Sequence, residues 1–121
     1  MEELFLSDSE YRLMDIIWNN APIESGKLVK LAQDKLNWKK STTYTILRKL
    51  TAKEMAVNED TVVKVLVERD RVQRYESSRV VGRNFGGSLP SFITAFLGDK
   101  TLTSDEADEL IDLIDSYRND N

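Results

Sequence analysis

The chain has 121 residues, 40% of them hydrophobic and 31% charged, with a formal net charge of −4. This composition is that of a folded protein with one domain, or with a small domain and an appendage. It contains no cysteine and no histidine, which excludes disulfides, zinc fingers, cysteine nucleophiles and a histidine general base.

Several further classes of protein are not expected from the sequence. No apolar run approaches the roughly 20 residues that a membrane helix needs, and the acidic start MEELFLSDSE does not resemble a signal peptide. No acidic or nucleophilic residues are spaced so as to converge on one site. We therefore expect a cytoplasmic protein that is not an enzyme, with no membrane insertion, no metal site and no cofactor.

Two helices are predicted at the start of the chain. Ser7 and Glu10 form a capping box, and the helix that they open continues to about Trp18. Pro22 breaks the pattern, because the residue before a proline disfavours the helical conformation. A second helix is expected over about residues 25–36, with Leu28, Ala32 and Leu36 on one side. Its N-cap is either Glu24 or Ser25.

A third helix, expected over residues 41–54, has two different faces. Residues at helical spacing should face a core: Thr43, Ile46, Leu47 and Leu50. Hydroxyl and cationic residues lie on the other side: Ser41, Thr42, Thr45, Arg48 and Lys49. Small hydroxyl side chains allow a helix to approach base edges, and lysine and arginine supply long donors. A solvated basic face is the alternative, but three short helices in this order favour a helix-turn-helix.

The charge of this segment differs from that of the whole chain. Residues 35–53 hold six of the 17 lysines and arginines and no acid, whereas residues 99–121 hold eight of the 21 acids and two bases. Phosphate binding depends on the local patch more than on the total charge. The acidic tail should therefore lie away from any nucleic acid.

A β-hairpin is predicted after the third helix. Val63, Val65 and Val67 alternate with other residues as in a strand, with residues 55–58 as the partner and residues 59–61 as the turn. Such a hairpin is either a wing or a plain cover for the core. The predicted fold is mainly α with a small β-hairpin, that is, a winged helix-turn-helix domain (residues 1–69) followed by a helical dimerisation domain (residues 70–121).

The second domain should contain three helices. One begins near Asp70 and ends before Gly86, a short one lies within residues 89–97 after Pro90, and a capping box at Thr103 opens the last. So small a domain cannot bury its apolar stripes alone, and we expect a homodimer. Packing of these stripes on the first domain is the alternative. The predicted dimerisation residues are Phe85, Leu89, Phe92, Ile93, Phe96, Leu110, Ile111, Ile114 and Tyr117.

Four segments in the same order resemble one family of proteins. They are LSDSEYRLMDIIW, the recognition pattern at residues 38–50 (Trp38, Thr42, Thr45, Ile46, Lys49 and Leu50), RNFGGSLPSFITAFL and TLTSDEADELIDLI. The family is that of the penicillinase repressors, which includes the methicillin-resistance and copper-transport repressors of bacteria. The resemblance implies a homodimer that binds double-stranded, palindromic operator DNA through one recognition helix per half-site.

The resemblance also implies which residues contact DNA. Carried onto this chain, they are Ser41, Thr42, Thr45 and Lys49, while Lys39, Lys40 and Arg48 are candidates for phosphate contacts on charge alone.

The chain departs from the family pattern at several positions. Lys49 replaces the usual arginine and lacks its planar fork. Glu54 replaces the usual glycine, which removes the easy left-handed cap of the helix. The turn at Glu59-Asp60 is acidic, so we give the wing little weight in DNA binding. Without cysteine, the chain should not sense copper as the copper-responsive branch does. A regulatory protease is a further candidate partner, but the pair at the family's cleavage site is Ala95-Phe96 instead of Asn-Phe. The alternative function is a winged-helix interaction module that does not bind DNA.

Overall fold

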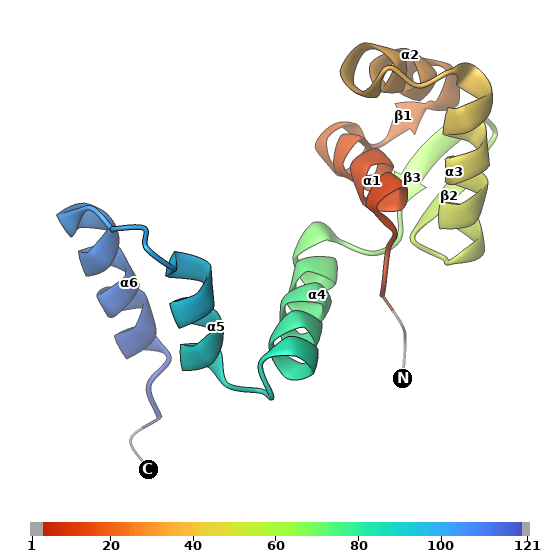
Figure 1. The fold of residues 1–121 in the computed structure, drawn as a ribbon. Helices are drawn as coiled ribbons and strands as arrows, with labels where there is room; N and C mark the ends of the chain where they lie inside the picture. The colour runs from red at the N-terminus through yellow and green to blue at the C-terminus, as the bar shows by residue number, and fades with distance from the viewer. Residues whose placement is uncertain (1–3, 120–121) are drawn as a thin grey trace. The chain divides into compact units, whose positions relative to one another are not determined.

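The computed structural model describes residues 4–119. The chain divides into two compact units, the first of which ends at Val80 and the second of which begins at Val81 (Figure 1). The predicted class, mainly helical with a small antiparallel hairpin, is confirmed.

The first helix, α1 (Asp8–Asn20), begins at the predicted capping box. The Glu10 backbone N–H donates to the Ser7 hydroxyl, and the Ser7 N–H donates to the Glu10 carboxylate at 2.7 Å. These two bonds satisfy donors that the first turn of a helix leaves unpaired. The helix runs two residues past the predicted end, to Asn20.

The next two helices are joined by a short turn. Helix α2 (Ser25–Leu36) has the predicted bounds, and its N-cap is Glu24. It ends because Asn37 adopts a left-handed conformation, with φ 58°. Three residues later α3 (Lys40–Ala52) begins. Asparagine tolerates this backbone region better than most residues, which allows the tight turn.

The strands form a three-stranded antiparallel sheet in the order β1-β3-β2. Strands β2 (Ala56–Glu59) and β3 (Val62–Val65) are the predicted hairpin, shifted by a residue or two. The turn is shorter than predicted: Asp60 and Thr61 alone form it, both with positive φ, as two-residue hairpin turns require. Strand β1 (Ile23–Glu24) was not predicted, because two residues show no alternation.

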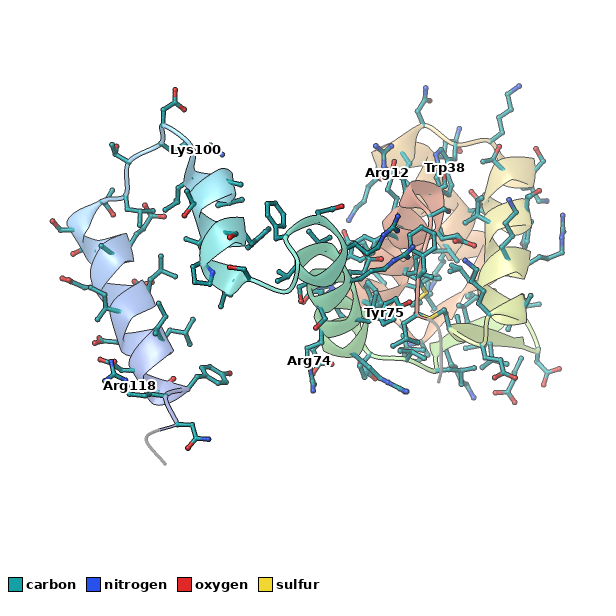
Figure 2. All side chains as sticks on the ribbon, turned by 60° about the horizontal axis from the view of Figure 1, so that its bottom comes forward. Arg12, Trp38, Arg74, Tyr75, Lys100 and Arg118 are labelled. Atoms are coloured by element: carbon teal, nitrogen blue, oxygen red, sulfur yellow. The ribbon has the colours of Figure 1, made fainter. Side chains whose placement is uncertain are left out.

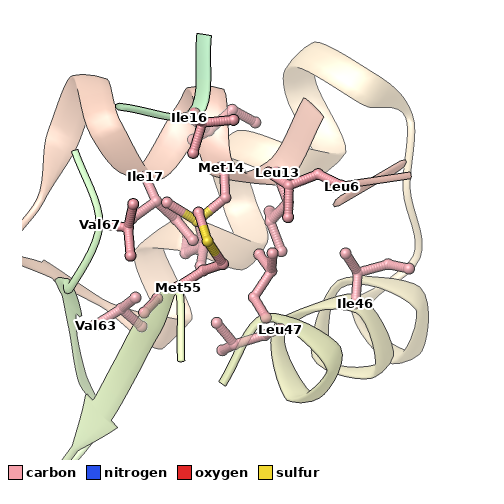
Figure 3. Close-up of a cluster of buried hydrophobic side chains, with 14 of the residues drawn as sticks. Leu6, Leu13, Met14, Ile16, Ile17, Ile46, Leu47, Met55, Val63 and Val67 are labelled. Carbon is pink, nitrogen blue, oxygen red and sulfur yellow. The ribbon is translucent and has the colours of Figure 1, made fainter. Parts of the chain in front are cut away.

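One hydrophobic core holds the first unit together. Leu13, Met14, Ile16 and Ile17 from α1 meet Ile46 and Leu47 from α3 (Figure 3). Leu6, Met55, Val63 and Val67 complete the part of the cluster labelled there. The apolar stripes predicted from helical spacing are therefore buried together, and they fix which side of α3 faces outward.

The first turns of helix α4 (Arg69–Asn84) pack against the rest of the first unit. Val72 is fully buried, and Tyr75 packs against the core while Arg74 bonds to Asp70 at the surface (Figure 2). The Arg69 guanidinium bonds to Asp15 at 2.9 Å and lies 5.3 Å from the Trp18 ring centre. The first unit consequently extends to Val80, beyond the boundary expected at residues 69 and 70.

The second unit contains α5 (Leu89–Leu97) and α6 (Ser104–Ser116) after the end of α4. Both helices were predicted, and Thr103 with Glu106 forms the expected second capping box. Between α4 and α5, Gly86 and Gly87 adopt positive φ of 57° and 80°, where a side chain would be strained. Phe92 is in ring contact with Phe85 and with Phe96.

Candidate nucleic-acid interface

Helix α3 has the two faces that its spacing predicted. Thr43, Ile46, Leu47 and Leu50 are buried against the rest of the first unit. The residues proposed from the sequence to contact DNA are all exposed: Lys39, Lys40, Ser41, Thr42, Thr45, Arg48 and Lys49. The helix itself spans Lys40–Ala52 instead of residues 41–54, so it starts earlier and ends earlier than expected.

The end of α3 explains why the helix stops early. The Glu54 N–H donates to the Thr51 carbonyl and the Met55 N–H to the Leu50 carbonyl, at 3.1 and 3.0 Å. This pair of bonds is the Schellman motif, which needs a left-handed residue after the cap. Glu54 fills that place with φ 59°, although it has a side chain. Glu54 therefore adopts the left-handed backbone conformation for which glycine is the usual residue.

The beginning of α3 carries positive charge. Lys39 is the N-cap, and its side chain makes no capping hydrogen bond. The N–H groups of a first turn carry partial positive charge and favour an anion. Lys40 follows directly, and the first turn contains no acidic residue. This end of the helix has the electrostatics that suit a phosphate group.

The hydroxyl groups of the exposed face differ in their hydrogen bonds. Thr45 Oγ1 donates to the Ser41 carbonyl at 2.9 Å and accepts a bond from Arg48 Nη2 at 3.4 Å. Within residues 4–119, Thr42 Oγ1 and Ser41 Oγ have no hydrogen-bond partner. Lys49 forms no ion pair with another described residue. Thr42, Ser41 and Lys49 are thus free to bond to an external group.

Two residues of the basic segment have structural roles instead. Lys53 Nζ donates to the Glu10 carboxylate at 2.7 Å and to the Phe5 carbonyl at 3.1 Å. Tyr44, whose ring is half-buried, has its hydroxyl 3.3 Å from that of Ser25. Sequence position alone placed both beside the residues proposed to contact DNA, and only the tertiary contacts separate them from that group.

The carboxyl group of Glu10 is nearly fully buried. Burial by itself would raise its pKa, but the hydrogen bonds from Lys53 and Ser7 stabilise the charged form and outweigh burial. The pKa of Glu10 therefore lies below its ordinary value, and its carboxyl group is ionised at neutral pH.

The hairpin turn is acidic and is attached to α2. The Ser25 N–H donates to the Thr61 carbonyl at 2.7 Å, which fixes the turn against the start of α2. Lys64 Nζ lies 3.6 Å from Glu59, so the hairpin's lysine is close to an acid of the same hairpin. Asp60 is exposed with no cation within salt-bridge distance among the described residues. The electrostatics of this turn are unsuited to phosphate.

The second unit exposes much of its apolar surface. Of the residues predicted for dimerisation, Phe85 and Phe92 are half-buried, and the others are exposed: Leu89, Ile93, Phe96, Leu110, Ile111, Ile114 and Tyr117. Ala95 and Phe96 lie within α5, and the Lys100 ammonium is 4.8 Å from the Phe96 ring centre. A protease would have to unwind this helix to bring the pair into an extended conformation.

Neither a metal-binding cluster nor a membrane-spanning helix is found among residues 4–119. No group of three or more acidic residues is arranged to hold a metal ion. None of the helices in that range has the length and apolarity to cross a membrane.

The features of the first unit define a class of protein. A three-helix core, a three-residue turn before an exposed helix and a following antiparallel hairpin make a winged helix-turn-helix domain. Comparison with known proteins agrees: the model of the penicillinase repressor family matches residues 6–116. The chain belongs to this family, whose members are transcriptional repressors and not enzymes. It is similar to the penicillinase repressor of Bacillus licheniformis, with 27% identity over 120 residues that cover 94% of this chain and 92% of that protein.

Proposed function

We propose that the chain represses transcription by binding a palindromic operator in double-stranded DNA as a homodimer. Helix α3 of each protomer enters the major groove of one half-site, and the bound dimer occludes the promoter. The observation that carries this proposal is the outward face of α3, where hydroxyl and cationic side chains are exposed over a segment without any acid.

Three parts of the helix would make different contacts with DNA. Its first turn, with Lys39 and Lys40, suits a backbone phosphate. Its middle, with Thr42 and Thr45, is small enough to approach base edges. Arg48 and Lys49 are long enough to reach a phosphate or a guanine, although lysine lacks the planar fork with which arginine binds guanine. The acidic hairpin turn would stay away from the phosphates.

Dimerisation would come from the second unit. Its exposed apolar side chains, seven of the nine predicted, are more than a soluble monomer usually leaves in contact with water on two short helices. A two-fold dimer buries the same patch on both protomers and presents two recognition helices with two-fold symmetry. A palindromic operator has the matching symmetry.

For repression to be relieved, the protein must also be able to release its operator DNA. A cut within α5, at Ala95-Phe96 or nearby, would divide the proposed dimer surface and lower operator affinity. A regulatory protease is therefore a candidate partner of this chain.

The proposal is tested by titrating the full chain into duplex DNA from the promoter of its own gene at two salt concentrations. We expect specific binding that weakens steeply with salt, because lysine–phosphate contacts release counterions. An unrelated duplex of equal length is the control. If both duplexes bind equally weakly, the chain is better explained as a winged-helix interaction module, which the acidic hairpin turn also favours.

A further inference from the structure

Thr42 and Thr45 lie on the same side of α3, three residues apart, but their hydroxyl groups are not equivalent. The hydrogen of Thr45 Oγ1 is donated to the Ser41 carbonyl at 2.9 Å, and Arg48 Nη2 approaches the same oxygen at 3.4 Å. The Thr42 hydroxyl has no partner among the described residues. The Thr45 hydroxyl is therefore hydrogen-bonded within α3, whereas the Thr42 hydroxyl is not.

The bond of Thr45 determines what it can offer to a base. A threonine hydroxyl has one hydrogen, which here is already used, and Arg48 occupies part of its acceptor capacity. To donate to a base, Thr45 would have to rotate about χ1 and break its bond to Ser41, and β-branched side chains are stiff at χ1 in helices. The group left without a bond is the Cγ2 methyl.

The major groove of DNA presents one matching apolar group. The C5 methyl of thymine projects into that groove, and threonine methyls contact it in protein–DNA complexes. Cytosine without methylation has no such group, and deoxyuridine is thymidine without it.

We propose that Thr45 selects a thymine in each operator half-site through methyl–methyl contact, while Thr42 binds DNA through its hydroxyl. This inference rests on the proposed function and assigns two different modes of recognition to two neighbouring threonines.

The test uses the full chain and a duplex that it selects from random DNA. Each thymine in the half-sites is replaced in turn by deoxyuridine, which removes one methyl and changes no base pairing. We expect one position per half-site at which wild-type affinity falls by about three- to tenfold, as the loss of a buried methyl contact allows. This arm needs no variant, so it does not depend on how any substitution folds.

Paired substitutions then assign the methyl to Thr45. Thr45→Val keeps both branches and removes the hydroxyl, and it should retain more operator affinity than Thr45→Ser. Thr45→Ser removes the methyl, and it should lose affinity on thymine operators but lose nothing more when the sensitive thymine is deoxyuridine. Thr42 is the matched comparison, where the order reverses: Thr42→Val should weaken binding more than Thr42→Ser does. Circular dichroism of each variant checks that α3 remains folded.

The outcomes separate this inference from the proposed function. An operator whose thymine methyls can all be removed without effect would overturn the inference while leaving DNA binding intact. Loss of affinity in Thr45→Val but not in Thr45→Ser would overturn it as well. If random DNA yields no selected duplex, the proposed function fails, and the inference fails with it.

Discussion

Lys53, the C-cap residue of α3, donates a 2.7 Å hydrogen bond to the carboxylate of Glu10 in the first turn of α1. The same carboxylate accepts the Ser7 N–H of the capping box, so one buried group joins the start of α1 to the end of α3. The pair therefore helps to fix the position of α3 within the first unit.

Glu10→Gln should destabilise the protein by about 1–2 kcal/mol at neutral pH, because it removes a charge-assisted hydrogen bond from a buried position. Glutamine can still accept the Ser7 N–H, so the loss reports the charge pair and not the cap. Denaturant unfolding measures the difference. Lys53→Met is the reciprocal variant, and the double variant should cost less than the sum of the two if the residues interact.

The Glu10 carboxyl group should also make the free energy of unfolding depend on pH. Since the pKa of Glu10 is lowered by folding, its contribution is present above the ordinary glutamate pKa and is lost as the pH falls through the folded-state value. Unfolding curves collected between about pH 5 and pH 3 should show wild type losing more stability than Glu10→Gln. Parallel losses in both proteins would contradict this assignment.

Glu54→Gly should stabilise the protein by about 0.5–1 kcal/mol. Glu54 holds a left-handed conformation with φ 59°, which is strained for a residue with a side chain and free of strain for glycine. Glu54→Ala controls for loss of the acidic side chain and should give no comparable gain. Thermal or denaturant unfolding decides between them, and equal effects of glycine and alanine would mean that backbone strain is not the cause.

Lys49→Ala should weaken operator binding by about 1–3 kcal/mol and, if its partner is a phosphate, reduce the slope of affinity against salt by about one ion. Lys49 is exposed and unpaired among the described residues, so folding should be unaffected. Lys64→Ala removes the same charge from the hairpin and is the control. An equal loss of affinity in both variants would point to net charge instead of a contact made by α3.

Ile114→Glu should convert the proposed dimer into a monomer at micromolar concentration. Ile114 is 63% exposed in the single chain, so a polar residue there costs the isolated unit little, whereas a dimer that buries it would be strongly weakened. Sedimentation velocity measures the change, with Asp108→Asn on the polar side of α6 as the control. A wild-type protein that already sediments as a monomer would remove the basis for dimerisation through α6.

Most elements could be predicted from local signals. The capping boxes at Ser7 and Thr103 set the starts of α1 and α6, and the spacing of Thr43, Ile46, Leu47 and Leu50 separated the two faces of α3. These signals are carried by residues close together in sequence, because helical periodicity and capping are local properties.

The features that sequence reasoning missed depend on contacts between distant residues. Strand β1 exists only because Ile23 and Glu24 pair with Val63 and Val62 of β3. The first unit continues into α4 because Arg69 and Val72 contact α1 and the core. Lys53 belongs to the basic run in sequence, but it is bonded to Glu10 of α1, a contact that its position in the run does not indicate. No local pattern contains this information.

The central claim, that two copies of α3 bind a two-fold symmetric operator, is tested most directly by selection from random duplexes. The full chain is incubated with a random DNA pool at moderate salt, and the bound duplexes are amplified and sequenced over several rounds. We expect an enriched palindrome whose half-sites are separated by about one helical turn, roughly 10 base pairs, or a multiple of it. Enrichment of a single asymmetric site, or no enrichment over the starting pool, would contradict it.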